Sequence, residues 1–133
     1  MLERKKGGIF FLSSVLGYSA SPYFANYAAS KAYNLFMGGA LWSELKAAGI
    51  DVSVLCPGST QTEFDKVSGH KGFVTMEAEA VVRTGLRNIG KPYIVAGVRN
   101  KLAVLLIKIF TRRITTIIMG IFMRKMSIPE EKL

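Results

Sequence analysis

Cysteine, histidine and acidic residues are scarce in this sequence. Its 133 residues include one cysteine, Cys56, and one histidine, His70. This scarcity excludes a disulfide framework and any metal site built from several Cys or His ligands, and it favours a reducing, cytoplasmic compartment. Lys and Arg number 18 against 9 Asp and Glu, which gives a formal net charge of +9 at pH 7. Such a charge suits an anionic cofactor, a nucleic acid or a membrane surface without choosing among them.

The composition predicts a folded domain. Half of the residues are hydrophobic and 14 are Phe, Tyr or Trp, so the low hydrophobicity of disordered chains is absent. A chain of this length buries roughly two-thirds of its unfolded surface, which allows a core without disulfide or metal staples.

Two apolar runs flank a long segment with helical spacing. Residues 8–13 predict a strand buried on both faces. Small and apolar residues recur at helical spacing over residues 26–48, and Gly49 offers a left-handed stop, so we expect a long helix there. Residues 50–56 predict a second strand, ended by the turn signal Pro57-Gly58. Strand, helix and strand in this order make a βαβ unit.

The alternation of strands and helices continues beyond this unit. Residues 59–75 lack periodicity and predict a long loop or a mobile short helix, of the kind that often forms a lid. Thr75 is expected to cap a helix that begins near Met76. Its expected apolar face comprises Val81, Val82, Leu86 and Ile89. Residues 93–97 predict a third strand, so the fold class is α/β with a parallel sheet of about three strands and right-handed crossovers.

The end of the sequence is apolar but interrupted by charge. Lys108, Arg112 and Arg113 lie within residues 100–126, so a membrane-spanning helix is not expected. Arg113 would fall on the apolar face of a single helix, which predicts a break at Thr111 and two amphipathic helices. Their apolar stripes are expected to comprise Leu102, Leu105, Leu106, Ile109 and Phe110, and then Ile114, Ile117, Ile118, Ile121 and Phe122.

Two kinds of surface could cover these stripes. We expect docking on the domain's own core or on a second subunit, and the alternative is contact of the basic tail with a membrane surface. The sequence thus divides into a domain over residues 1–98 and an amphipathic helical tail over residues 99–133.

The residues that can carry chemistry lie around the predicted strand ends. Tyr27 and Lys31 are four residues apart in the long helix, so their side chains emerge on one face. An ammonium near a phenol favours the phenolate, which makes Tyr27 an acid/base candidate. Ser14 and Pro57-Gly58 follow the first two strands. Because ligands of doubly wound sheets bind at the carboxyl ends of the strands, these features should share one crevice.

Together these motifs carry a resemblance to a known family. They comprise residues 8–14, Gly17, Pro22, residues 26–31 (NYAASK), Pro57-Gly58 and Thr62. Ser14 precedes Tyr27 by thirteen positions, and Tyr27 and Lys31 form a Tyr-x-x-x-Lys pair. This pattern resembles the active site of the short-chain dehydrogenases/reductases, and the resemblance extends over residues 7–97. It implies a Rossmann-like doubly wound sheet and an NAD- or NADP-dependent oxidoreductase that acts on a carbonyl/alcohol pair.

The resemblance implies a role for each matching residue. Tyr27 looks like the catalytic acid/base, Ser14 like the hydroxyl that binds the substrate oxygen, and Lys31 like the residue that holds the nicotinamide ribose and makes Tyr27 more acidic. The segment that lines the nicotinamide is matched by Pro57, Gly58, Thr60 and Thr62. There is also a physical reason for a glycine at position 58, because the absence of a Cβ lets another group approach the backbone closely.

The match concerns only the C-terminal half of the family's pattern. No Thr-Gly-x-x-x-Gly-x-Gly turn for the pyrophosphate occurs in the sequence, and Gly7-Gly8 precede a strand instead of opening a helix. The residue that selects NAD or NADP is missing too. We therefore expect a truncated, partial Rossmann-like unit that associates or aggregates in isolation. The alternative function is a non-catalytic fragment that serves as an oligomerisation or membrane-surface module.

The remaining expectations concern partners. The substrate should be a small, hydrophobic carbonyl or alcohol compound. Small residues in the long helix permit close packing of a second copy, and the family commonly uses this helix in dimer or tetramer interfaces, so we expect a homo-oligomer. These small residues are Ala28, Ala29, Ala32, Gly38 and Gly39. The basic residues lack interleaved aromatics, so nucleic acid binding is not expected. We interpret His70 as a solvated surface residue and Cys56 as a small core residue. The chain is expected to be cytoplasmic, with peripheral membrane association as the alternative.

Overall fold

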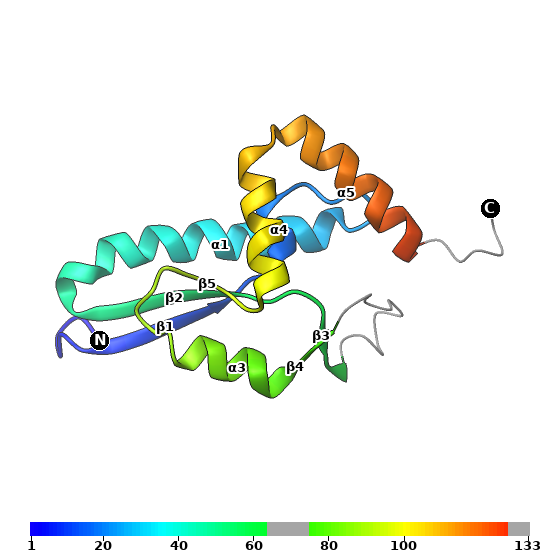
Figure 1. Ribbon diagram of the computed structural model, residues 1–133. Helices are drawn as coiled ribbons and strands as arrows, with labels where there is room; N and C mark the ends of the chain where they lie inside the picture. Colours follow the sequence, from blue (N-terminus) through cyan, green and yellow to red (C-terminus); the bar gives the residue numbers. More distant parts are fainter. Residues whose placement is uncertain (64–74, 128–133) are drawn as a thin grey trace.

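Three parallel strands form the centre of the molecule (Figure 1). The structure is a computed structural model that describes residues 1–63 and 75–127. β1 (Gly7–Leu12) pairs with β2 (Ile50–Cys56), and β2 pairs with β5 (Tyr93–Val95), which gives the order β1-β2-β5. The predicted α/β fold with a parallel sheet is therefore confirmed, and the second strand has the predicted bounds.

Helices cover both faces of this sheet (Figure 1). α1 (Ala25–Leu45) continues into the 3₁₀ turn η2 (Lys46–Ala48), and Gly49 ends it with a φ of 70°. This geometry confirms the predicted long helix and its left-handed stop, because glycine enters that region without a Cβ clash. α3 (Ala78–Leu86) lies against the opposite face.

Alternate side chains of β2 supply the core on the two faces. Val54 and Cys56 pack with Leu35 of α1, while Leu55 packs with Val81 of α3 on the other face. Ile94 and Ala96 extend the second cluster. The alternation follows from the two-residue repeat of a strand, and helices on both faces leave β2 almost entirely buried.

The expected burial of the first strand on both faces is wrong. Exposed and half-buried residues alternate along β1, with Phe10 42% and Leu12 54% exposed. β1 lies at the edge of the order β1-β2-β5, so within the described residues it has a strand neighbour on one side only. Leu12 pairs with Leu55, whose side chain packs on α3, so the exposed residues of β1 lie on the face that α3 covers only in part.

The segment between β2 and α3 contains a short pairing that the sequence did not predict. β3 (Thr60–Gln61) pairs in parallel with β4 (Met76–Glu77). α3 begins only at Ala78, so the expected cap at Thr75 is wrong. The Thr75 hydroxyl instead accepts a hydrogen bond from Gln61 Nε2 at 3.0 Å. The rest of the expected lid, including His70, lies outside the described residues.

The expected apolar face of α3 is only partly buried. Val81 is 4% exposed and joins the core. The other three members are about half exposed, namely Val82, Leu86 and Ile89. The side of α3 that faces the sheet carries Val81 and Gly85, one helical turn apart, so the expected face is right at Val81 and wrong at the other three residues.

Two helices follow β5, as the interrupted charge pattern predicts. α4 (Val98–Ile109) and α5 (Arg112–Ser127) are separated at Phe110 and Thr111. All ten residues of the predicted apolar stripes are 42–67% exposed, so their expected docking on the domain's own core is wrong. Within the described residues, no helix has the length and apolar character needed to cross a membrane.

Two of the small residues of α1 face the chain's own sheet. A Cβ on Gly38 would overlap Val54 Cγ2 and lie 3.0 Å from Phe11 Cδ2. A Cβ on Gly39 would meet the hydroxyl of Tyr93, the end of a side chain that is 44% exposed. Gly38 and Gly39 thus bring α1 close to its own sheet, and the expected homo-oligomer stays a prediction.

This packing predicts that substitutions at two neighbouring glycines change the free energy of unfolding by different amounts. Gly38→Ala is expected to destabilise the fold by about 1–3 kcal/mol, because a stiff, buried valine must move to admit the methyl group. Gly39→Ala is the matched control. The Tyr93 ring can swing away, and alanine improves helix propensity by up to about 1 kcal/mol. Urea unfolding measures both, and equal stabilities of the two variants would contradict the packing.

Candidate functional site

The candidate site lies at the carboxyl ends of β1 and β2. The ladder between these strands continues past their ends, since Ser13 N donates to Leu55 O at 2.8 Å and Val15 N donates to Pro57 O at 2.9 Å. Ser14 and Pro57 are thereby fixed side by side. This pairing places Ser14 and Pro57 at one edge of the sheet, and the predicted crevice that they share with Tyr27 stays a prediction.

Ser14 is buried and already uses its hydroxyl. Its Oγ accepts a hydrogen bond from Leu16 N at 3.2 Å, which caps the 3₁₀ helix η1 (Val15–Tyr18). The same hydroxyl donates to Pro57 O at 3.4 Å, which is long for an O–H···O bond. A hydroxyl can rotate its hydrogen while its oxygen stays in place. Ser14 can therefore redirect its donor to another acceptor and still cap the helix.

Lys31 is anchored between the end of β1 and the ring of Tyr27. Its Nζ donates to Leu12 O at 3.2 Å and lies 5.5 Å from the centroid of the Tyr27 ring. Ser13 Oγ donates to the backbone oxygen of Lys31 at 2.7 Å and ties α1 to the strand end. The helix spacing of four residues thus brings Tyr27 and Lys31 together, and the serine beside Ser14 holds that turn in place.

Asn34 is a member of this arrangement that the sequence reasoning missed. Its Nδ2 donates to Leu12 O at 3.1 Å, the same carbonyl oxygen that Lys31 Nζ contacts. A signal was present, because Asn34 lies three residues after Lys31 and seven after Tyr27, on the same helix face. Lys31 and Asn34 therefore share one acceptor, the backbone oxygen of Leu12 at the end of β1.

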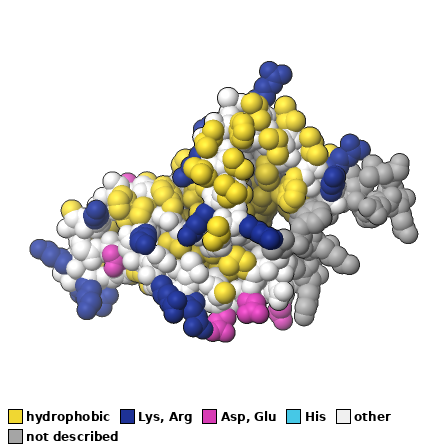
Figure 2. Space-filling model, viewed as in Figure 1, with side chains coloured by type: hydrophobic (Ala, Val, Ile, Leu, Met, Phe, Trp, Pro, Cys, Tyr) yellow, Lys and Arg dark blue, Asp and Glu magenta, His cyan; other side chains and the backbone are white. Residues whose placement is uncertain are grey.

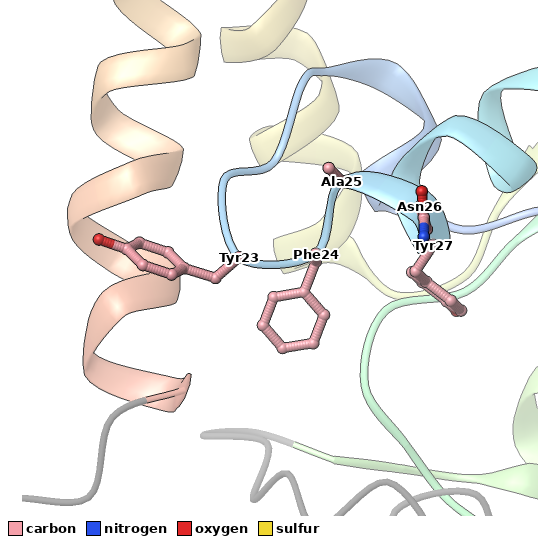
Figure 3. Close-up of a pocket in the computed structure, with 5 residues that line it drawn as sticks. All are labelled: Tyr23, Phe24, Ala25, Asn26 and Tyr27. Carbon is pink, nitrogen blue, oxygen red and sulfur yellow. The ribbon is translucent and has the colours of Figure 1, made fainter.

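An open pocket of about 440 Å³ adjoins Tyr27 (Figure 3). It is lined by Tyr23, Phe24, Ala25, Asn26 and Tyr27. Figure 3 shows the rings of Phe24 and Tyr27 projecting on the same side of the segment that leads into α1. Tyr23 has a φ of 68°, a left-handed conformation that is uncommon for a residue with a side chain. The adjacent aromatics Tyr23 and Phe24, in a loop at the carboxyl edge, were the unused sequence signal for this pocket.

The segment after β2 packs more tightly than the sequence suggests. A Cβ on Gly58 would lie 2.5 Å from Oδ1 of Asn100, so the space beside this glycine is taken by a side chain of α4. Asn100 is held there, because its Nδ2 donates to Ala96 O at 2.6 Å. The Thr60 hydroxyl donates to Gly58 O at 3.1 Å, and Thr62 is exposed. Gly58 thus permits a close approach, but the group that approaches here is Asn100.

Cys56 lies beneath the site without being part of it. It is completely buried, and its Sγ donates to the Tyr18 hydroxyl at a distance of 3.8 Å. Burial raises the pKa of the Cys56 thiol. Burial also raises the pKa of Tyr18 far above its ordinary value, and the neighbouring Cys56 thiol makes a smaller contribution in the same direction. A buried thiol that resists ionisation is a poor nucleophile. The interpretation of Cys56 as a core residue is confirmed.

Comparison with known proteins identifies relatives of this chain. The family model described as short chain dehydrogenase matches residues 1–71. The human 17-beta-hydroxysteroid dehydrogenase 13 is 36% identical over 87 residues, which make up 63% of this chain and 29% of the human protein. The chain therefore spans less than a third of that relative's length.

Two solved structures share the fold of the described residues. A 7beta-hydroxysteroid dehydrogenase structure has a TM-score of 0.67 and 30% identity, and the match covers 77% of this chain and 42% of that one. A short-chain dehydrogenase from Sphingobium yanoikuyae in complex with NADPH has a TM-score of 0.63 and 28% identity, with coverage of 78% and 43%.

Proposed function

Because the chain belongs to the short-chain dehydrogenase family, we propose that its carboxyl-edge site takes part in NAD(P)-dependent oxidoreduction of a carbonyl/alcohol pair. The observation that carries this proposal is the position of Lys31. Its ammonium lies between the Leu12 carbonyl and the Tyr27 ring, beside the strand ends that bear Ser14 and Pro57. A cation next to a tyrosine ring, at the sheet edge that also bears the Ser14 hydroxyl, supports this proposal.

The residues present fit the nicotinamide end of the cofactor. The ammonium of Lys31 has three N–H donors, of which Leu12 O engages one, so donors remain for the hydroxyls of a ribose. Lys31, Tyr27 and the segment from Pro57 through Gly58 and Thr60 to Thr62 would hold this end. The sequence contains no glycine-rich turn for the pyrophosphate. When bound, the cofactor supplies the hydride for a carbonyl carbon or accepts it from an alcohol.

The protein residues handle the proton and the developing charge. In reduction, the Tyr27 hydroxyl gives its proton to the carbonyl oxygen as the hydride reaches the carbon, so that an alcohol and a phenolate result. The nearby Lys31 ammonium stabilises that phenolate. The Ser14 hydroxyl turns toward the substrate oxygen and stabilises the charge that develops on it. In oxidation Tyr27 removes the hydroxyl proton and the same groups act in reverse.

The substrate proposed here is a hydrophobic carbonyl or alcohol compound. Two adjacent aromatic residues, Tyr23 and Phe24, line the pocket beside Tyr27. Pockets that combine such apolar walls with one or two polar groups favour apolar ligands and orient their polar end. The names of the relatives point the same way, because they include hydroxysteroid dehydrogenases and very-long-chain 3-oxoacyl-CoA reductases.

Cofactor consumption tests this proposal. The 133-residue chain is incubated with NADPH or NADH and a steroid ketone or an oxoacyl thioester, and the loss of reduced cofactor is followed by absorbance. We expect substrate-dependent consumption and an alcohol product. Circular dichroism of the same sample confirms that the chain is folded. A folded chain that consumes neither cofactor with either substrate would overturn the proposal.

A further inference from the structure

α4 and α5 present a continuous apolar face to the surroundings. Its ten large residues form the exposed hairpin face, and each is at least 42% exposed: Leu102, Leu105, Leu106, Ile109, Phe110, Ile114, Ile117, Ile118, Ile121 and Phe122. Figure 2 shows hydrophobic side chains gathered over these two helices, with Lys and Arg at the margins. Exposed apolar surface of this size marks an interaction site.

The exposure does not result from loosely attached helices. The opposite side of each helix is docked, since Val104 of α4 and both Thr115 and Met123 of α5 are buried. A Cβ on Gly120 would lie 3.3 Å from Pro22 Cγ, so α5 lies directly on the loop before α1. The hairpin is therefore held on the body by one side while its main apolar stripes face outward.

The charges around the exposed hairpin face have one sign. Residues 98–127 contain no Asp or Glu. Apart from Lys108, whose Nζ lies 5.3 Å from the centroid of the Tyr18 ring, their cations are Arg99, Lys101, Arg112, Arg113, Arg124 and Lys125. In α5 these cations lie at both ends of the apolar stripe, in the first turn and the last. Long basic side chains at the ends of an apolar stripe can reach polar headgroups while the stripe is immersed.

We infer that the exposed hairpin face binds the surface of an anionic membrane. The amphipathic pattern provides apolar area to insert among lipid chains, and the cations provide attraction to acidic headgroups. A second copy of this chain fits the same surface less well, because a two-fold contact would bring two sets of cations together without any acidic residue from either hairpin. The helices lie on the membrane in this proposal, since neither is suited to spanning it.

Vesicle flotation of the full chain tests this inference. Phosphatidylcholine vesicles with and without phosphatidylserine are compared at about 0.1 M and about 1 M salt, where the Debye length is about 10 Å and about 3 Å. We expect binding to the phosphatidylserine vesicles at low salt and at least a tenfold loss of binding at high salt. The double substitution Ile117→Asp/Ile121→Asp is expected to reduce binding at least tenfold, as is Arg124→Glu/Lys125→Glu.

Matched controls distinguish binding through the exposed hairpin face from nonspecific binding by other parts of the protein surface. Phe36→Asp changes an apolar residue of α1 that is 69% exposed and lies outside the hairpin, and Lys5→Glu/Lys6→Glu changes two exposed cations near the N-terminus. Both controls are expected to bind as the unmodified chain does. Binding that ignores lipid charge, or that falls equally in controls and hairpin variants, would overturn the inference. The inference would also be overturned if the unmodified chain failed to bind vesicles and instead formed a dimer that only the hairpin substitutions dissociate.

Discussion

Tyr27→Phe is expected to lower turnover by about 10²- to 10⁴-fold, the usual contribution of a general acid or base. The substitution removes the hydroxyl that gives or takes the proton. The ring stays, and with it the apolar wall of the pocket and the contact with Lys31 Nζ, 5.5 Å from the ring centroid. Substrate affinity should therefore change little, so the loss should appear in kcat and not in KM.

Tyr33→Phe is the matched control for this prediction. Tyr33 lies on the same helix and is 65% exposed, so its hydroxyl can be removed at no cost to the site. Both variants are compared in steady-state reduction of the same ketone at saturating NADPH. Equal kcat values for Tyr27→Phe and the unmodified chain would show that another group transfers the proton.

Lys31→Met is expected to weaken cofactor binding and slow the reaction, each at least tenfold. The change removes the ammonium that is proposed to bind the ribose hydroxyls and to stabilise the Tyr27 phenolate. The fold should tolerate it. Asn34 Nδ2 still donates to Leu12 O at 3.1 Å, so the strand-end carbonyl keeps a hydrogen-bond partner. Unfolding transitions of the variant and the unmodified chain should nearly coincide.

Lys46→Met serves as the control for Lys31→Met. Lys46 Nζ lies 4.9 Å from the centroid of the Trp42 ring, so it makes a comparable cation–aromatic contact at the other end of the same long helix. This variant should bind cofactor and turn over substrate normally. If the two lysine substitutions have the same effect, net charge rather than position would explain the result.

Local patterns predicted the parts of this fold that depend on local interactions. The second strand lies between the helix stop Gly49 and the turn at Pro57, and its observed bounds equal the predicted ones. Arg113 on an otherwise apolar face correctly indicated the break between α4 and α5. The pairing of Tyr27 with Lys31 followed from helix geometry alone.

Features that depend on distant neighbours were not predictable in this way. The exposure of Phe10 reflects the incomplete cover of β1 by α3, a helix distant in sequence, which the strand's own residues do not encode. The approach of Asn100 to Gly58 joins residues 42 positions apart. The β3–β4 pairing involves two residues on each side, too few for any periodicity. The catalytic and binding roles of Ser14, Tyr27 and Lys31 stay predictions.

A fluorescence titration of NADH and NADPH into the folded 133-residue chain tests the central claim most directly. The claim is that the edge formed by Ser14, Tyr27, Lys31 and Pro57 is a nicotinamide site. We expect saturable binding of at least one of the two cofactors, and we expect Lys31→Met but not Lys46→Met to weaken it. A chain that circular dichroism shows to be folded and that binds neither cofactor saturably would contradict the claim.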